Sequence, residues 1–410
     1  MSEEKELTLQ DVEQAVMNHS AAAYRCVTKL QPAGGPGDKV FPPTYEGGKY
    51  AIEERITPNG EVIKCVLLDS VQSQANRMEL ALLDAVRAKK ISLPLLEVRF
   101  DQKNLKKKMV VTSLDAPHRV ADAIFRDSLM GGVAFRKSEK GKILDRADLR
   151  NATGLFGLCP TALLFGIWDS TGPRGGLGTK FQRAIVSEII GYNAVPGVKT
   201  SSRIDPLQVM LGAGPLYVRN ETNDKTPDWT FDEDKAVQEK NKAKKLGKDG
   251  KPSEANHGNI TPTISDGGFT ISYALQTMVI SLSALRRLRF PLNGSAESDP
   301  KVNAAARTTL TILGLTAATL AQEDGLDLRS RCQLYPTEKA VWELLDVPNA
   351  SPKRFQLDGK TAENLLKEAI EKAKKPGLPW EGEIYLQPTE DLVTLVAKSQ
   401  ELAANESTEE

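Results

Sequence analysis

The sequence predicts an α+β fold, with a core of the split βαβ, ferredoxin-like type that is interrupted by large insertions. Segments with strand periodicity and segments with helical periodicity alternate irregularly, without the long regular series of βα units that a barrel requires. The chain has 410 residues, enough for one large core or two ordinary ones. Its 40% hydrophobic and 26% charged residues are typical of a soluble globular protein.

The first half of the chain predicts a strand, a helix and two further strands after an irregular, Gly/Pro-rich loop at residues 31–48. Residues 61–68 are apolar and β-branched enough for a strand, and Asp69 or Ser70 can cap the helix that follows. Apolar residues recur at helical spacing on this helix and predict its buried face: Val71, Ala75, Met78, Leu82 and Val86. Residues 95–100 and 108–114 predict strands that are joined by a basic turn.

In the second half, residues 162–168 predict an apolar strand that leads into a glycine-rich loop and then a helix. Residues 198–204 predict another strand. A strong amphipathic helix is predicted where five apolar residues share one face: Ile271, Leu275, Met278, Leu282 and Leu285. Asp299 and Pro300 are a good cap and first turn for an alanine-rich helix, too short and too weakly apolar to span a bilayer, so we expect it to be buried.

Charge and cysteine usage limit the function classes. The net charge is zero, but both termini are acidic, so the central part of the chain carries an excess of basic residues and is compatible with a nucleic-acid groove. The four cysteines lie far apart and there are only three histidines, so we expect no disulfide framework and no metal site. No secretory signal is apparent at the N-terminus, and a reducing cytoplasm fits best.

The glycine-rich loop, residues 171–178, is typical of a phosphate cradle. Gly175 and Gly176 allow close approach to the backbone, and three cations flank them, namely Arg174, Lys180 and Arg183. The Walker A motif is not satisfied, because the glycine spacing is too long and the order of Thr179 and Lys180 is reversed. A nucleoside triphosphate site is therefore disfavoured, and a tight structural turn without a ligand stays open.

Polar and basic residues crowd the start of the helix after Ser70. They are Gln72, Ser73, Gln74, Asn76 and Arg77. Amide and guanidinium groups suit contacts to phosphate, ribose and base edges. An ordinary solvated helix face is the better explanation for a single residue of this kind, and the clustering brings the two interpretations to about even.

Three further features of the sequence have both a structural and a functional interpretation. His118 and Arg119 begin a short helix, where a lone histidine is more often a packing or capping residue than a catalyst. Asp169 precedes the glycine-rich loop and could serve strand cleavage, but no second acid accompanies it, so a role in turn geometry is favoured. Residues 219–263 are rich in lysine and predict an insertion without a core of its own, either a solvated linker or a segment that lies along a nucleic-acid strand.

Five segments together resemble one family. They are Ser-Val-Gln-Ser-Gln-Ala-Asn-Arg-Met-Glu (70–79), Asp-Ala-Pro-His-Arg-Val-Ala-Asp (115–122), Phe-Gly-Ile-Trp-Asp-Ser-Thr-Gly-Pro-Arg-Gly-Gly-Leu-Gly-Thr-Lys-Phe-Gln-Arg (165–183), Ser-Leu-Ser-Ala-Leu-Arg-Arg-Leu-Arg-Phe-Pro (281–291) and Asp-Leu-Arg-Ser-Arg-Cys (327–332). In this order they look like the backbone subunit of the type I-G (formerly I-U) CRISPR Cascade, a member of the RAMP superfamily. The resemblance covers about residues 20–345.

The resemblance implies a modified RRM-like fold whose copies polymerise along a guide RNA. Residues 46–205 and 265–345 would form the palm, residues 206–264 the thumb, residues 1–45 an N-terminal segment, and residues 346–410 a helical extension with an acidic tail. The implied RNA-binding residues are Gln72, Ser73, Gln74, Asn76, Arg77, His118, Arg119, Arg174, Gly175, Gly176, Lys180, Arg183 and Arg203. No catalytic residue, metal or cofactor is expected.

The implied partners are guide RNA, target DNA through the guide, neighbouring copies of the chain and other Cascade subunits, without a membrane. Base pairing would supply the sequence specificity, so the protein needs contacts to the RNA backbone rather than to base edges. Two alternatives stay open. One is a target-cleaving member of the superfamily that uses Asp169, and the other is a free-standing RNA-binding protein.

Overall fold

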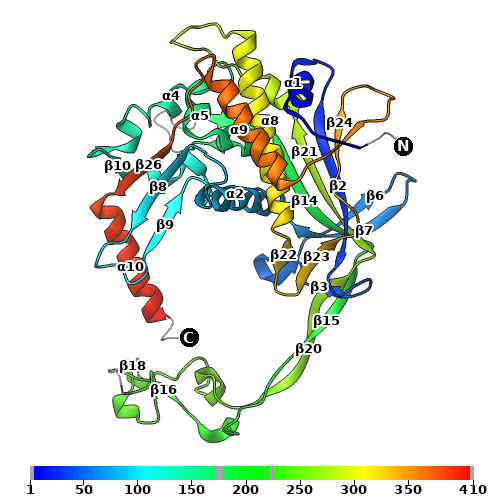
Figure 1. The fold of residues 1–410 in the computed structure, drawn as a ribbon. Helices are drawn as coiled ribbons and strands as arrows, with labels where there is room; N and C mark the ends of the chain where they lie inside the picture. The colour runs from blue at the N-terminus through cyan, green and yellow to red at the C-terminus, as the bar shows by residue number, and fades with distance from the viewer. Residues whose placement is uncertain (1–3, 171–178, 222–224, 407–410) are drawn as a thin grey trace. The chain divides into compact units, whose positions relative to one another are not determined.

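The computed structural model describes residues 4–170, 179–221 and 225–406 (Figure 1). The chain divides into two compact units. Unit 1 comprises Met1–Asp101, Lys108–Val195 and Phe269–Leu392, and unit 2 comprises Gln102–Lys107, Pro196–Gly268 and Val393–Glu410. Both helices and sheets contribute to the fold, so the predicted α+β class is confirmed, while the ferredoxin-like detail stays a prediction.

A ten-stranded sheet forms the framework of unit 1. Its order is β1 (Lys5–Glu6), β25 (Lys353–Gln356), β24 (Trp342–Leu345), β2 (Ala23–Pro32), β21 (Tyr273–Ser281), β14 (Ile185–Tyr192), β7 (Val62–Asp69) and β6 (Ile52–Ile56), with β22 (Leu326–Arg329) and β23 (Cys332–Pro336) attached through β2. The central pairs are antiparallel, and β21 lies between β2 and β14. Short strands accompany the loop after β2: β3 (Lys39–Val40), β4 (Thr44–Tyr45) and β5 (Lys49–Tyr50).

The predicted amphipathic helix at residues 271–285 is wrong. Residues 273–281 form strand β21, and only Leu282–Arg286 is helical, as α7. Every second side chain of β21 is buried, which is the period of a strand. The helical spacing of the apolar residues is real, but pairing with β2 and β14 on both sides overrides it.

Long helices cover the sheet of unit 1. Helix α2 (Val71–Arg87) begins at the predicted Ser70 cap and packs against α8 (Pro300–Glu323) and β14. Helix α8 also contacts α1 (Leu9–Met17), α9 (Gly359–Lys374) and β21. By length and composition α8 could cross a membrane, so the expectation that it is too short and too weakly apolar is wrong. Because 78% of its apolar window is buried in the protein, it is a core helix, as predicted.

A second sheet of five strands joins the C-terminal part of the chain to the segment after α2. Its order is β11 (Val133–Ala134), β10 (Ser128–Met130), β26 (Glu383–Pro388), β8 (Leu95–Phe100) and β9 (Met109–Thr112). Strand β26 pairs parallel with β8. The segment between β10 and β14 contains short helices, and another precedes β10: α3 (Ala123–Arg126), α4 (Ile143–Arg146), α5 (Thr153–Leu158) and α6 (Pro160–Phe165).

The predicted strand and helix around the glycine-rich loop are also wrong. Residues 160–165 form helix α6, which starts with Pro160 at its first turn, and only β12 (Ile167–Trp168) is extended. After the loop come β13 (Lys180–Phe181) and β14, not a helix. A short apolar stretch that is buried on all sides has no periodicity to separate helix from strand. The loop therefore does not lead into a helix N-terminus, and the predicted phosphate cradle loses that feature.

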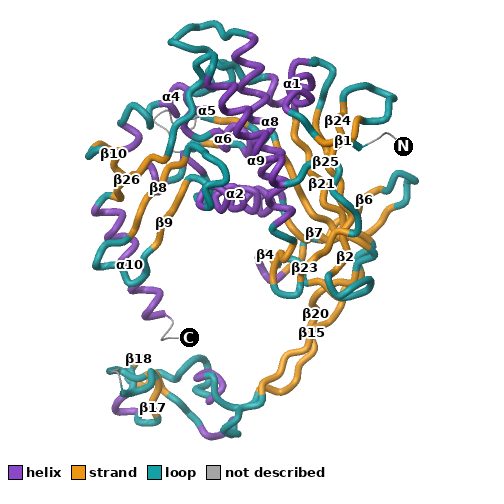
Figure 2. Tube along the Cα trace, viewed as in Figure 1, coloured by secondary structure: helices purple, strands orange, loops and turns teal. Residues whose placement is uncertain are grey.

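Unit 2 contains a ribbon of β15 (Val195–Arg203) and β20 (Ile260–Thr270), and two short hairpins that lie between these two strands in the chain (Figure 2). The hairpins are β16 (Tyr217–Val218) with β17 (Trp229–Thr230), and β18 (Gln238–Glu239) with β19 (Lys242–Ala243). Helix α10 (Glu390–Glu406) lies mostly in this unit. Ala236 and Leu246 are buried, so the expectation that the insertion at residues 219–263 has no core is wrong in part.

Candidate nucleic-acid interface

Helix α2 presents a polar outer face on unit 1. Ser70 Oγ accepts a hydrogen bond from the Ser73 backbone N–H at 3.2 Å, which fixes the start of the helix. Gln72 and Asn76 are exposed, and Ser73 and Arg77 are half-buried. Four of the predicted RNA-binding residues therefore have accessible side chains on consecutive turns of one helix.

Gln74 does not belong to this face, which corrects its predicted contact with RNA. Its side chain is only 2% exposed. The amide donates to Asp69 Oδ2 at 2.6 Å, and its Oε1 accepts from Ser187 Oγ and Gln276 Nε2, both at 2.8 Å. Because its carbonyl oxygen and one amide N–H are already satisfied inside the protein, Gln74 ties the start of α2 to strands β14 and β21.

The carboxylate of Asp69 is the centre of this buried network. Besides Gln74, it accepts from Arg77 Nε at 2.9 Å and from Arg329 at 3.2 Å. The same two arginines donate to backbone carbonyls, Arg77 to Leu328 at 2.8 Å and Arg329 to Leu68 at 2.7 Å. The network links β7, α2 and β22, so Arg77 has a structural partner and an exposed part at the same time.

Arg119 is buried, which corrects its predicted role as an RNA contact. Its guanidinium forms a bidentate pair with Glu79 of α2, with both distances 2.7 Å, and donates to the Gly166 carbonyl at 2.9 Å. Burial raises the pKa of Glu79 to about 7, although the positive charge of Arg119 opposes the rise. Arg119 therefore positions α2 against the start of β12 rather than contacting a ligand.

Arg183 and His118 also keep accessible parts. Arg183 is half-buried and donates to the Phe165 carbonyl at 3.2 Å. Burial, followed by the nearby guanidinium of Arg119, lowers the pKa of Arg183. The side chain of His118 is accessible because the residue is exposed, and the hydrogen bond to Asp122, at 3.2 Å, is donated by the backbone N–H and not by the imidazole.

Lys180 and Trp168 form an exposed pair where the glycine-rich loop begins and ends. They are cross-strand partners on β12 and β13, and the Lys180 Nζ lies 5.3 Å from the centre of the Trp168 ring. Trp168 is 59% exposed. A flat aromatic face beside a cation can stack on a base while the cation meets a phosphate. The predicted residues Arg174, Gly175 and Gly176 lie outside the described residues.

Trp168 and Arg287 are not among the site residues that the sequence predicts. Arg287 and Lys180 line one cavity of about 220 Å³ in unit 1, together with apolar residues of α6 and α7. A signal for Trp168 was present, since it is a large aromatic residue next to a glycine-rich loop, but strand pairing across the loop is what sets it against Lys180. Arg287 lies in an arginine-rich segment with Arg286 and Arg289, but only the fold shows that it lines a cavity with Lys180.

Arg203 belongs to unit 2, whereas the other predicted residues that the structure describes belong to unit 1. Its guanidinium donates to the Gly258 carbonyl at 2.8 Å and 3.1 Å and thereby joins the two sides of the β15–β20 ribbon. Its predicted RNA contact stays a prediction, since the side chain is half-buried and already has these partners.

Asp169 is buried beside Arg136. Its carboxylate is 3% exposed and lies 3.0 Å from the Arg136 guanidinium, and its backbone N–H donates to the Thr179 carbonyl at 2.9 Å. Arg136 also pairs with Asp145 at 2.7 Å. These contacts give Asp169 a structural partner, and no cluster of potential metal ligands is present in the described part of the chain.

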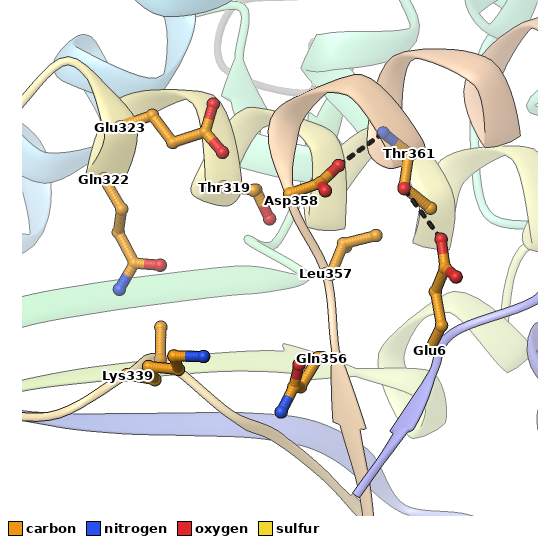
Figure 3. A pocket seen from close by; sticks show the side chains of 10 residues that line it. Glu6, Thr319, Gln322, Glu323, Lys339, Gln356, Leu357, Asp358 and Thr361 are labelled. Carbon is orange, nitrogen blue, oxygen red and sulfur yellow. Dashed lines mark hydrogen bonds between the residues drawn. The ribbon is translucent and has the colours of Figure 1, made fainter.

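A hollow of about 480 Å³ near the ends of α8 and α9 is lined mainly by acidic rather than basic side chains among its charged residues (Figure 3). Glu6, Glu323 and Asp358 contribute three carboxylates to its lining, against one lysine, Lys339. Two of these acids already hold Thr361, whose backbone N–H donates to Asp358 and whose hydroxyl donates to Glu6. A lining of this charge repels phosphate, so the hollow is not part of the nucleic-acid interface.

Comparison with known proteins identifies the region that carries this surface. No curated protein matches the chain. Residues 24–196 match the family model described as CRISPR-associated protein GSU0053. The matched region contains α2, the buried Arg119 and the Trp168–Lys180 pair. Over residues 24–196 the chain is thus similar to the CRISPR-associated GSU0053 family, which confirms the predicted relationship to CRISPR-associated proteins.

Proposed function

We propose that this chain is a non-catalytic backbone subunit of a type I-G Cascade complex in the cytoplasm, and that its copies polymerise along a guide RNA. The guide would then be presented for base pairing with target DNA, so that sequence is read by the RNA and not by the protein. The proposed partners are the guide RNA, neighbouring copies, other Cascade subunits and, through the guide, target DNA.

One observation carries this proposal. The match to a CRISPR-associated family covers the segment in which polar and basic side chains are exposed around α2 and β12. The accessible groups of this surface are amides, a hydroxyl, an imidazole and cations: Gln72, Ser73, Asn76, Arg77, His118, Lys180 and Arg183. Such groups can bind phosphate and ribose, which are the contacts that a scaffold for an arbitrary guide requires.

The surroundings of Asp169 favour a scaffold over a nuclease. A catalytic carboxylate must reach a metal ion, a water or the scissile phosphate. The Asp169 carboxylate is instead buried and lies against Arg136, and Arg136 is shared with Asp145. We therefore propose a structural role for Asp169 in the turn that precedes the glycine-rich loop.

Co-expression with a CRISPR array tests the proposal. We expect the purified protein to carry guide RNA, and nuclease trimming to leave protected lengths that rise in equal steps, one step for each added copy. Absorbance spectra and denaturing gels of the extracted RNA measure this outcome. The same protein expressed without the array is the control. A preparation free of nucleic acid after co-expression with the array would refute the proposed function.

Trp168 supplies a second, local test. We expect Trp168→Ala to weaken single-stranded RNA binding by about 1–3 kcal/mol, because the base stacked on the indole is lost. Trp168→Phe retains an aromatic face and should lose much less. Fluorescence anisotropy with a labelled RNA gives both affinities. Equal affinities for the alanine and phenylalanine variants would remove Trp168 from the proposed surface.

A further inference from the structure

Unit 2 contains a hollow of about 500 Å³ that is lined mainly by lysines. Five lysines contribute, together with Glu239, Ala243 and Gly247: Lys240, Lys242, Lys244, Lys245 and Lys248. All five side chains are exposed, and Glu239 is the single acid among the lining residues. We refer to these residues as the lysine hollow.

The lysines of the hollow differ from other lysines of the same unit. Lys235 pairs with Asp232 at 3.0 Å, and Lys251 pairs with Asp249 at 2.7 Å. Within residues 179–221 and 225–406, no ion pair involves a lysine of the hollow. Gathered positive charges that form no ion pair within these described residues repel one another, and this repulsion is relieved when an anion binds among them.

The backbone beneath the hollow is held in place. Strands β18 and β19 pair across a turn in which Lys240 and Asn241 have φ values of 51° and 62°, the geometry of a tight two-residue hairpin. The Lys244 N–H donates to the Val237 carbonyl at 2.8 Å, and its carbonyl accepts from Val218 at 2.9 Å. Buried Leu246 anchors the next residues. Lys240 and Lys242 thus project from a hydrogen-bonded hairpin, and the other three lysines follow it on backbone held by Lys244 and Leu246, so little backbone entropy is lost on binding.

We propose that the lysine hollow binds the phosphate backbone of a single-stranded nucleic acid, as a contact additional to the surface on unit 1. The identity of this nucleic acid rests on the proposed function, under which it is the guide RNA or the target strand that pairs with the guide. Lysine is a mobile point charge with three donors, which suits successive phosphates whatever the base sequence. The lining offers Ala243 as its one apolar side chain, so an acidic peptide would find no side-chain pocket there.

A charge-matched pair of variants tests the proposal in the full-length protein. The first variant is Lys242→Gln/Lys245→Gln/Lys248→Gln, within the hollow. The control is Lys225→Gln/Lys235→Gln/Lys251→Gln, which removes the same charge from unit 2 outside the hollow. Protein freed of co-purified nucleic acid is titrated with labelled oligouridine and oligothymidine at several salt concentrations. We expect the slope of log affinity against log salt to fall by about two in the hollow variant and to change little in the control.

Two comparisons extend this test. Guide RNA that co-purifies with the control variant but not with the hollow variant would place the guide in the hollow. Normal guide loading with weakened binding of a complementary strand would place the target strand there. Circular dichroism establishes that both variants are folded.

The inference fails if the two variants bind oligonucleotides with the same slope while the wild-type protein binds well, and the proposed function survives that result. It also fails if poly-L-glutamate binding depends on the hollow lysines and oligonucleotide binding does not. Absence of nucleic-acid binding by the wild-type protein would instead refute the proposed function.

Discussion

Replacing Asp69 by alanine is expected to lower the free energy of unfolding by about 3–5 kcal/mol. The Asp69 carboxylate is fully buried and accepts hydrogen bonds from Gln74, Arg77 and Arg329. Removing it leaves the partly exposed guanidinium groups of Arg77 and Arg329 without their shared counter-charge, and the buried Gln74 amide without one of its partners. The cost is therefore that of a network of contacts rather than of one lost contact.

Urea unfolding followed by circular dichroism measures this effect, and Asp84→Ala is the matched control. Asp84 is an exposed acid on the same helix, and its replacement should change stability by less than about 0.5 kcal/mol. Asp69→Asn should fall between the two, since it keeps the shape and one acceptor but loses the charge. An Asp69→Ala variant as stable as the control would show that the network does not hold α2 to β7 and β22.

Part of the network around Asp69 could be predicted from the sequence and part could not. Helix α2 was predicted with its cap because Ser70 and the apolar spacing are local signals. The inward direction of Gln74 was not, since its partners Ser187 and Gln276 are distant in sequence and meet it only when β14 and β21 pair. A polar residue on a predicted helix is assigned to the solvent face unless its buried partner is known.

Strand β21 and the surroundings of Arg119 illustrate the same limit. Residues 273–281 carry apolar side chains at a spacing that fits both a helix and a strand, and only the flanking strands decide. Helix α8, by contrast, was predicted well, because its cap at Asp299 and its long apolar run need no partner to be recognised. The burial of Arg119 cannot be predicted from its own segment either, because its partner Glu79 lies on a different element.

The Glu79–Arg119 pair gives the second large expected effect. Arg119→Met should lower the free energy of unfolding by about 3–5 kcal/mol near pH 8, because it leaves a buried carboxylate without its counter-charge. In the wild-type protein burial already raises the pKa of Glu79 from 4.5 to about 7. Between these values the folded protein holds a proton that the unfolded chain has released, so this group makes stability fall as pH rises through that window.

Loss of Arg119 removes the interaction that opposes the rise, so the pKa of Glu79 should climb further and the window should extend upward in pH. The stability deficit of Arg119→Met is therefore expected to be smaller near pH 5, where Glu79 is protonated in the folded variant, than near pH 8. The double variant Glu79→Gln/Arg119→Met buries no charge at this position and should recover much of the loss with little pH dependence. Urea unfolding of the three proteins at both pH values measures these differences. A deficit that is equal at the two pH values, or that the double variant does not reduce, would mean that Arg119 acts through its bond to the Gly166 carbonyl and not through the charge of Glu79.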